Sequence, residues 1–229
     1  MRSAAPPKAA GAVVRIPAGA GVIIEGSLEQ CAGERGLAHG VVLFAHGSGS
    51  SRFSPRNNFV AAELRRAGMT TLLLDLLTRE EDQDFEARFN IALLTERLGH
   101  AARWLKASPA TRSLPLGVFG ASTGAAAALR LAASMPAEIS VVVSRGGRPD
   151  LAGTAALEQV RAATLLIVGA RDTGVVELNR DAYRHLNCEK KLTLVPGATH
   201  LFEEPGTLER VAELACVWFA DRLARPQPR

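Results

Sequence analysis

The sequence lacks the features that mark several classes of protein. None of its apolar runs approaches the length that a membrane-spanning helix needs. Residues 1–10 contain two prolines and no hydrophobic signal core. The three cysteines, Cys31, Cys188 and Cys216, are odd in number and far apart, which argues against a disulfide framework and a zinc site. We therefore expect a cytoplasmic protein with no membrane partner.

Motifs for nucleotides and metals are also missing. The loop Gly47–Arg52 has neither the lysine nor the spacing of a phosphate-binding P-loop, and no Gly-x-Gly-x-x-Gly motif opens a helix. The five histidines are dispersed, without a His-x-x-x-His pair. The sequence therefore predicts no cofactor and no metal.

Charge and length describe an ordinary globular protein. The formal net charge is +4, but the arginines are scattered along the chain, which is typical of a solvated surface and predicts no nucleic-acid partner. A length of 229 residues, with 47% apolar and 22% charged residues, suits one domain over residues 1–229. We expect a monomer or homodimer, with a disordered tail at Arg225–Arg229.

Apolar runs alternate with helical patterns along the chain. An edge hairpin is expected from Val13–Ile16 and Val22–Leu28. The buried strands that follow are expected at Gly40–Ala45, Thr70–Leu74, Pro115–Phe119, Ile139–Val143, Thr164–Val168 and Lys191–Val195. Helices are expected at Pro55–Ala67, Phe85–Ala107, Ala125–Ala133, Leu151–Val160, Val175–Leu186 and Thr207–Leu223. This alternation predicts an α/β fold, a mostly parallel sheet with helices on both faces and no large cap domain.

The most informative segment is Gly120-Ala121-Ser122-Thr123-Gly124, which joins an apolar strand to an alanine- and leucine-rich helix. A serine on so sharp a turn is lifted out of the sheet toward a substrate. The flanking glycines fit because strand and helix pass close together there. This context predicts that Ser122 is a nucleophile.

Two further polar residues follow strands in the order that a Ser-Asp-His triad has in this fold. Asp172 comes after the Thr164–Val168 strand, and His200 follows the last strand. We expect His200 to act as the base and Asp172 to orient it. Asp172 could instead cap the next helix, in which case Asp150 is the alternative acid.

The loop after Gly40–Ala45 is expected to complete an oxyanion hole. One donor is the amide of Thr123, the residue after the nucleophile, and the other is the amide of Ser48 or Gly49. His46 is expected to hold this loop, since its place in the chain order is wrong for the base.

Three arginines are candidate substrate ligands. Arg145 and Arg148 follow the Ile139–Val143 strand, and Arg52 lies in the expected oxyanion loop. Each could bind a substrate carboxylate, but exposed arginines without such a role are common. Both interpretations stay open at the level of the sequence.

The chain resembles the dienelactone hydrolase family of α/β-hydrolases over about Val13–Ala224. The resemblance rests on the stretches that begin at His46, Gly120, Ser144, Val168 and Pro196, which read HGSGSSR, GASTG, SRGGRPD, VGARD and PGATH. The SRGGRPD stretch is similar to that of a small capless subgroup. The resemblance implies hydrolysis of carboxylic esters or lactones, with promiscuity toward phosphate triesters.

One residue departs from the family pattern. Members that open dienelactone use a cysteine nucleophile, whereas this chain has Ser122, which needs different activation. The sequence therefore predicts a serine carboxylesterase whose small-molecule substrates are small or short-chain esters, with lactones as a further class. A non-catalytic binding or regulatory protein, and a thioesterase or acyltransferase with the same triad, remain as alternatives.

Overall fold

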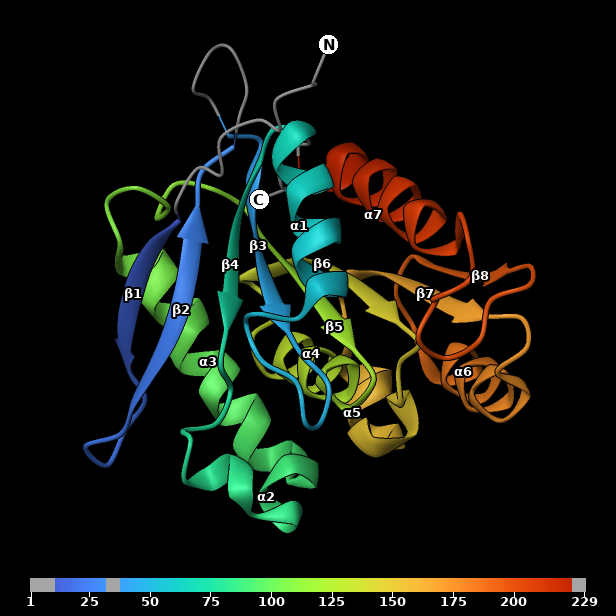
Figure 1. Ribbon diagram of the computed structural model, residues 1–229, viewed down its shortest axis with the longest axis horizontal. Helices are drawn as coiled ribbons and strands as arrows, with labels where there is room; N and C mark the ends of the chain where they lie inside the picture. The colour runs from blue at the N-terminus through green and yellow to red at the C-terminus, as the bar shows by residue number, and fades with distance from the viewer. Residues whose placement is uncertain (1–10, 32–37, 224–229) are drawn as a thin grey trace, which may run out of the picture.

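The computed structural model describes residues 11–31 and 38–223, and the expected tail Arg225–Arg229 lies outside them. Figure 1 shows a central twisted sheet covered by helices on both faces. Its eight strands lie in the order β1-β2-β4-β3-β5-β6-β7-β8. They are β1 (Ala12–Pro17), β2 (Ile23–Glu29), β3 (Gly40–Ala45), β4 (Met69–Leu74), β5 (Leu116–Ala121), β6 (Ile139–Arg145), β7 (Ala163–Gly169) and β8 (Lys190–Val195). Strand β2 is antiparallel to its neighbours β1 and β4, and the other pairs are parallel, as the sequence predicts.

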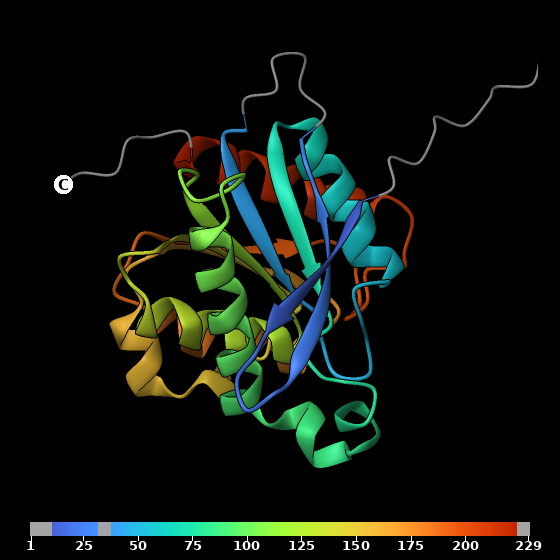
Figure 2. The same cartoon turned by 90° about the vertical axis from the view of Figure 1, so that its left-hand side faces the viewer.

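Helices cover the sheet in two layers. One layer consists of α1 (Pro55–Arg66) and α7 (Thr207–Leu223), which lie side by side (Figure 1). The other contains α3 (Ile91–Ala107), α4 (Thr123–Ser134), α5 (Thr154–Gln159) and α6 (Thr173–His185), with the short α2 (Phe85–Phe89) protruding below (Figure 2). Two 3₁₀ turns, η1 (Glu81–Gln83) and η2 (Pro149–Ala152), complete the elements.

The central strands are continuous apolar runs because both of their faces are buried. In β5, Val118 packs into the core beneath α3 and α4, whereas Phe119 packs into the core beneath α1 and α7. Strands β3, β4 and β5 are buried at every position. This burial is the pattern expected for parallel strands between two helical layers.

Two predicted helices are wrong in extent. The helix expected over Phe85–Ala107 is interrupted at Asn90, which ends α2 and caps α3 by accepting a hydrogen bond from the Leu93 amide at 3.0 Å. The helix expected over Leu151–Val160 is divided at Gly153, whose φ of 83° belongs to the left-handed region. In both cases the interrupting residue is of a type that favours helix ends.

The direction of the strands fixes where the loops lie. Strands β3 to β8 end at one edge of the sheet, the carboxyl edge, which turns with the sheet twist from below β3 and β4 to the right of β7 in Figure 1. Strand β1 starts at the opposite, amino edge, and Leu223 at the end of α7 packs there against Gly40. In the described part of the chain, no helix is long and apolar enough to cross a membrane.

Candidate active site

Ser122 stands at the turn between β5 and α4 with a strained backbone. Its φ of 51° and ψ of −121° are unusual for a residue with a side chain. Two hydrogen bonds, one to the last residue of β6 and one to the loop after it, hold this conformation. The Ser122 amide donates to the Arg145 carbonyl at 3.2 Å, and the Ser122 carbonyl accepts from the Arg148 amide at 3.1 Å. The hydroxyl is thereby presented at the carboxyl edge of the sheet.

The glycines around Ser122 are required by close packing. A Cβ atom at Gly120 would lie 2.5 Å from the Ala125 Cα atom, and one at Gly124 would overlap the carbonyl oxygens of Ala45 and His46. At Gly47, a Cβ atom would lie 3.0 Å from the Ser122 Cβ atom. The β3 loop therefore passes directly over the serine turn.

Asp172 and His200 are in contact. The His200 Nδ1 atom lies 2.6 Å from the Asp172 Oδ2 atom, across the ends of β7 and β8. Asp172 occupies the N-cap position of α6, but its side chain makes no capping hydrogen bond. The alternative acid, Asp150, is bound by the Arg148 guanidinium through two bonds of 2.9 and 2.7 Å. The geometry thus favours Asp172 over Asp150 as the partner of His200.

This contact assigns the tautomer of His200. Since an ionised carboxylate only accepts hydrogen bonds, Nδ1 must carry the proton and donate it to Asp172. The Nε2 atom is then an unprotonated acceptor whenever the ring is neutral. The ring lies against Gly146, where a Cβ atom would be 3.7 Å from His200 Cε1.

Gly146 follows Arg145, whose carbonyl accepts from the Ser122 amide, so β6 brings the histidine loop and the serine turn together. Ser122 and His200 both lie in the described ranges, but the structure contains no hydrogen bond from Ser122 Oγ to His200. Catalytic bonds are often longer in unliganded sites than in reacting complexes.

The expected oxyanion loop is held by His46. Its Nδ1 atom donates to the Gly47 carbonyl at 2.8 Å, and its Nε2 atom accepts from the Leu76 amide at 3.0 Å. Burial lowers the pKa of His46 below its usual value, so the ring is neutral at pH 7. His46 therefore serves the loop as a structural residue, as the sequence predicts.

The two expected oxyanion donors are linked to each other. The Ser48 amide donates to the Thr123 hydroxyl at 2.9 Å. Thr123 is the first residue of α4, and amides of the first helical turn have no partner within the helix. Gly49 adopts a φ of 66° at the tip of the same loop. The loop and the serine turn are thus joined at the place where a substrate oxygen is expected.

The three candidate arginines have different surroundings. Arg52 is paired with Asp75 and with Glu25, and Arg148 with Asp150. Arg145 is only 5% exposed and donates to the Asn57 side chain at 3.1 Å. Burial lowers the pKa of Arg145 to about 10. A role for any of the three in binding substrate remains a prediction.

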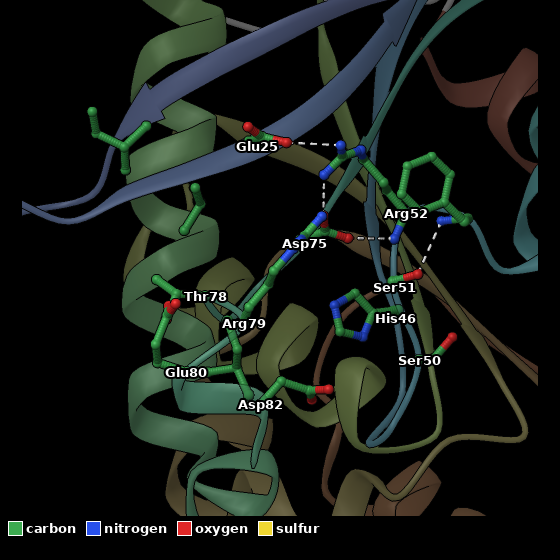
Figure 3. A pocket seen from close by; sticks show the side chains of 14 residues that line it. Glu25, His46, Ser50, Ser51, Arg52, Asp75, Thr78, Arg79, Glu80 and Asp82 are labelled. Atoms are coloured by element: carbon green, nitrogen blue, oxygen red, sulfur yellow. Dashed lines mark hydrogen bonds and ion pairs between the residues drawn. The ribbon is translucent and has the colours of Figure 1, made fainter. Parts of the chain in front are cut away.

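A cavity of about 480 Å³ lies beside the oxyanion loop (Figure 3). Residues 23–25, 50–53 and 77–80 line it, together with His46, Asp75 and Asp82. Neither Ser122 nor His200 is among them.

This cavity was not predicted, because an acidic stretch such as residues 80–82 is expected at the start of a helix from the helix dipole alone. The signal that was present is a run of polar residues after the end of a central strand, which is where ligands bind in such sheets.

Metal-binding side chains do not gather in the described ranges, where no group of three or more His, Cys, Asp or Glu residues could hold an ion.

Two curated proteins are similar to this chain. They are proteins of two strains of Mycobacterium tuberculosis, each named "Putative phosphoribosyl transferase", and each is 58% identical over 189 residues. The match covers 82% of this chain but only 42% of each relative. The chain therefore spans less than half the length of the curated relatives it matches. No protein-family model matches the sequence.

Some solved structures match over nearly the whole length of both chains. A dienelactone hydrolase from Anabaena variabilis is 50% identical, with a TM-score of 0.87, over 93% of this chain and 97% of that one. An α/β serine hydrolase without a lid from Xanthomonas campestris has the same fold, with a TM-score of 0.77 at 19% identity over 96% and 98% of the two chains. Because half of the residues are shared with the Anabaena protein over nearly its full length, this chain belongs to the dienelactone hydrolase family of α/β-hydrolases.

Proposed function

We propose that the protein is a serine esterase that hydrolyses small carboxylic esters through an acyl-enzyme. Ser122 is the nucleophile, His200 the general base and acid, and Asp172 the residue that orients His200. The hydrogen bond between Asp172 and His200 is the observation that carries the proposal. It explains why an aspartate at a helix start leaves the cap unused, and it prepares the imidazole to accept a proton at Nε2.

The first half of the reaction forms the acyl-enzyme. Ser122 Oγ attacks the ester carbonyl carbon while His200 Nε2 takes the hydroxyl proton. The imidazolium that results is stabilised by the Asp172 carboxylate 2.6 Å from Nδ1. When the tetrahedral intermediate collapses, the bond between carbon and the alcohol oxygen breaks, and His200 returns the proton to the departing alcohol.

The negative oxygen of the intermediate needs donors. We propose the amide of Thr123 and the amide of Ser48 or its neighbour Gly49. The Ser48 amide already donates to the Thr123 hydroxyl, so the substrate oxygen would replace that hydroxyl as acceptor. Loss of one such donor typically costs about 100- to 1,000-fold in rate.

The second half of the reaction consumes water. The His200 side chain is 38% exposed, so a water molecule can reach Nε2 once the alcohol has left. His200 then activates this water, which attacks the acyl carbon and regenerates Ser122.

The names of the relatives bear on the proposal in different ways. The dienelactone hydrolase from Anabaena matches over 93% of this chain and 97% of its own, which supports hydrolysis of an ester or lactone bond. The phosphoribosyl transferase name belongs to proteins of which more than half lies outside the match. We therefore propose no phosphoribosyl transfer for this chain.

A covalent probe tests the proposal directly. Intact wild-type protein treated with a fluorophosphonate should gain the mass of one adduct, located at Ser122 by peptide mapping. Ser122→Ala should show no adduct and no hydrolysis of p-nitrophenyl acetate. Ser134→Ala, at the far end of the same helix, is the matched control and should behave like wild type. An unlabelled wild type without ester turnover would refute the esterase.

A further inference from the structure

The cavity beside the oxyanion loop has a composition that points to one class of ligand. Its volume of about 480 Å³ lies in the range of small-molecule sites, about 300–1,000 Å³. It opens between the β2 and β4 strands, the loop 50–53 and the segment 77–82 (Figure 3).

The cavity lies at the same sheet edge as the triad. Asp75 follows the end of β4, and β3 separates β4 from β5, the strand that leads to Ser122. Neighbouring strands are about 4.8 Å apart, so the two strand ends are separated by about 10 Å. The β3 loop spans this gap, and its Gly47 lies against Ser122 while its Ser50 and Ser51 line the cavity. A substrate held at Ser122 can therefore extend across the loop into the cavity.

Four of the six charged side chains that line the cavity are held in ion pairs, and the other two, Arg79 and Glu80, are adjacent and of opposite sign. The Arg52 guanidinium bonds both Asp75 and Glu25, the latter at 2.7 Å. Asp82 accepts from the Arg88 side chain at 3.2 Å. A charged ligand would have to compete with these pairs, and a long acyl chain would leave them without water. Their arrangement therefore favours a neutral ligand that is polar along its length.

The remaining lining groups suit hydroxyls. Carboxylates of the ion pairs retain lone pairs that accept hydrogen bonds, whereas Ser50 and Thr78 carry hydroxyls that both donate and accept. A ligand hydroxyl also does both. The Phe53 ring is 68% exposed and packs on the Arg52 guanidinium, with 4.5 Å between Cζ and the ring centre. It offers an ordered aromatic face, on which the C–H groups of a sugar ring can stack.

We propose that this cavity binds the alcohol portion of the ester, and that this portion is a neutral sugar or similar polyol. This inference rests on the esterase proposed above and names its substrate class. The acyl group is transferred to Ser122, the bond to the sugar oxygen breaks, and His200 protonates that oxygen. The free sugar leaves from the cavity, and water then releases the acid.

Two acetate esters of primary alcohols isolate the contribution of the cavity. Ethyl acetate and glucose 6-acetate share the acyl group and the type of leaving oxygen. For wild type, we expect kcat/KM to be about 10- to 100-fold higher for glucose 6-acetate, the effect of one or two additional hydrogen bonds and stacking. Acetylcholine is also the acetate ester of a primary alcohol, but its alcohol portion is cationic. It should react no faster than ethyl acetate.

Matched variants locate the effect. Phe53→Ala should lower kcat/KM for glucose 6-acetate about 10-fold and leave that for ethyl acetate unchanged. Phe85→Ala removes an equally exposed phenylalanine, 71% exposed, that does not line the cavity, and should change neither rate. Binding of glucose to Ser122→Ala, measured by NMR titration, should also be lost on adding Phe53→Ala.

The outcomes separate the two proposals. Equal kcat/KM for both acetates, with no glucose binding to Ser122→Ala, would overturn the sugar site while leaving the esterase intact. Preference for acetylcholine would overturn it in favour of a cationic alcohol. Absence of turnover with every ester would refute the esterase, and glucose binding that depends on Phe53 would still support the sugar site.

Discussion

Within the described ranges, Arg145 is a buried cation without a carboxylate partner, and replacing it should stabilise the protein. Its guanidinium donates to the neutral Asn57 side chain, and its Nε atom has no hydrogen-bond partner in the described structure. The charged side chain that affects its pKa is another cation, Arg56, which lowers it further. By contrast, the buried Arg97 bonds Glu81 at 2.7 Å. Burying a charge without compensation is costly, and an apolar side chain of similar length removes that cost.

The magnitude follows from the pKa of Arg145. The lowering of the Arg145 pKa to about 10 penalises the charged form by about 3 kcal/mol, since one pH unit corresponds to about 1.4 kcal/mol. The variant Arg145→Met loses the hydrogen bond to Asn57 and leaves its oxygen without a donor, which costs about 1–2 kcal/mol. The net gain is about 1–2 kcal/mol, or an increase in Tm of roughly 2–6 °C for a chain of this size.

Thermal unfolding followed by circular dichroism at pH 7 measures this shift. Arg97→Met is the opposite control, because it leaves Glu81 without its partner and should lower the Tm. If Arg145→Met also lowered the Tm, the reasoning that Arg145 lacks compensation would be refuted.

Three further outcomes are expected. Asp172→Asn should keep the Tm but reduce kcat for p-nitrophenyl acetate by about 10⁴-fold, because the amide favours the wrong tautomer of the histidine; retention of more than a tenth of the activity would argue against its orienting role. Gly124→Ala should prevent folding or destabilise the protein by about 4 kcal/mol or more, since its Cβ overlaps two carbonyl oxygens of the β3 strand and loop, and soluble protein with wild-type denaturant resistance would contradict this. His46 should make the protein acid-sensitive. Burial lowers its folded-state pKa, so the unfolded chain takes up the proton first, and stability falls as pH decreases below about 6.5. Urea unfolding of His46→Gln between pH 7.5 and 5 should show a flatter dependence than wild type, and identical slopes would exclude His46 as the cause.

The fold could be predicted from sequence because burial on both faces leaves a strong pattern. Continuous apolar runs such as Gly40–Ala45 identified the central strands. The breaks at Asn90 and Gly153 were not predicted, because the apolar periodicity of the following residues continues through them. A local hydrogen bond at Asn90 and a left-handed backbone at Gly153 determined the outcome there.

The three site residues Ser122, Asp172 and His200 were predicted from their order along the chain and their positions after strands. The surroundings of the arginines could not be predicted, because their partners are distant in sequence. Asn57 is 88 residues from Arg145, and Asp75 is 23 from Arg52. Spacing along one chain holds no information on such pairs, which depend on which strands become neighbours.

The positions at which the described chain starts and stops bear on how the fold can be joined to others. Strand β1 begins and α7 ends at the amino edge, opposite the edge that bears Ser122 and the cavity. A second domain, a surface anchor or an affinity tag linked at either end would be attached at the amino edge of the sheet. The substrate-facing edge would stay accessible, so the same hydrolase unit can be embedded in much longer proteins without redesign of its site.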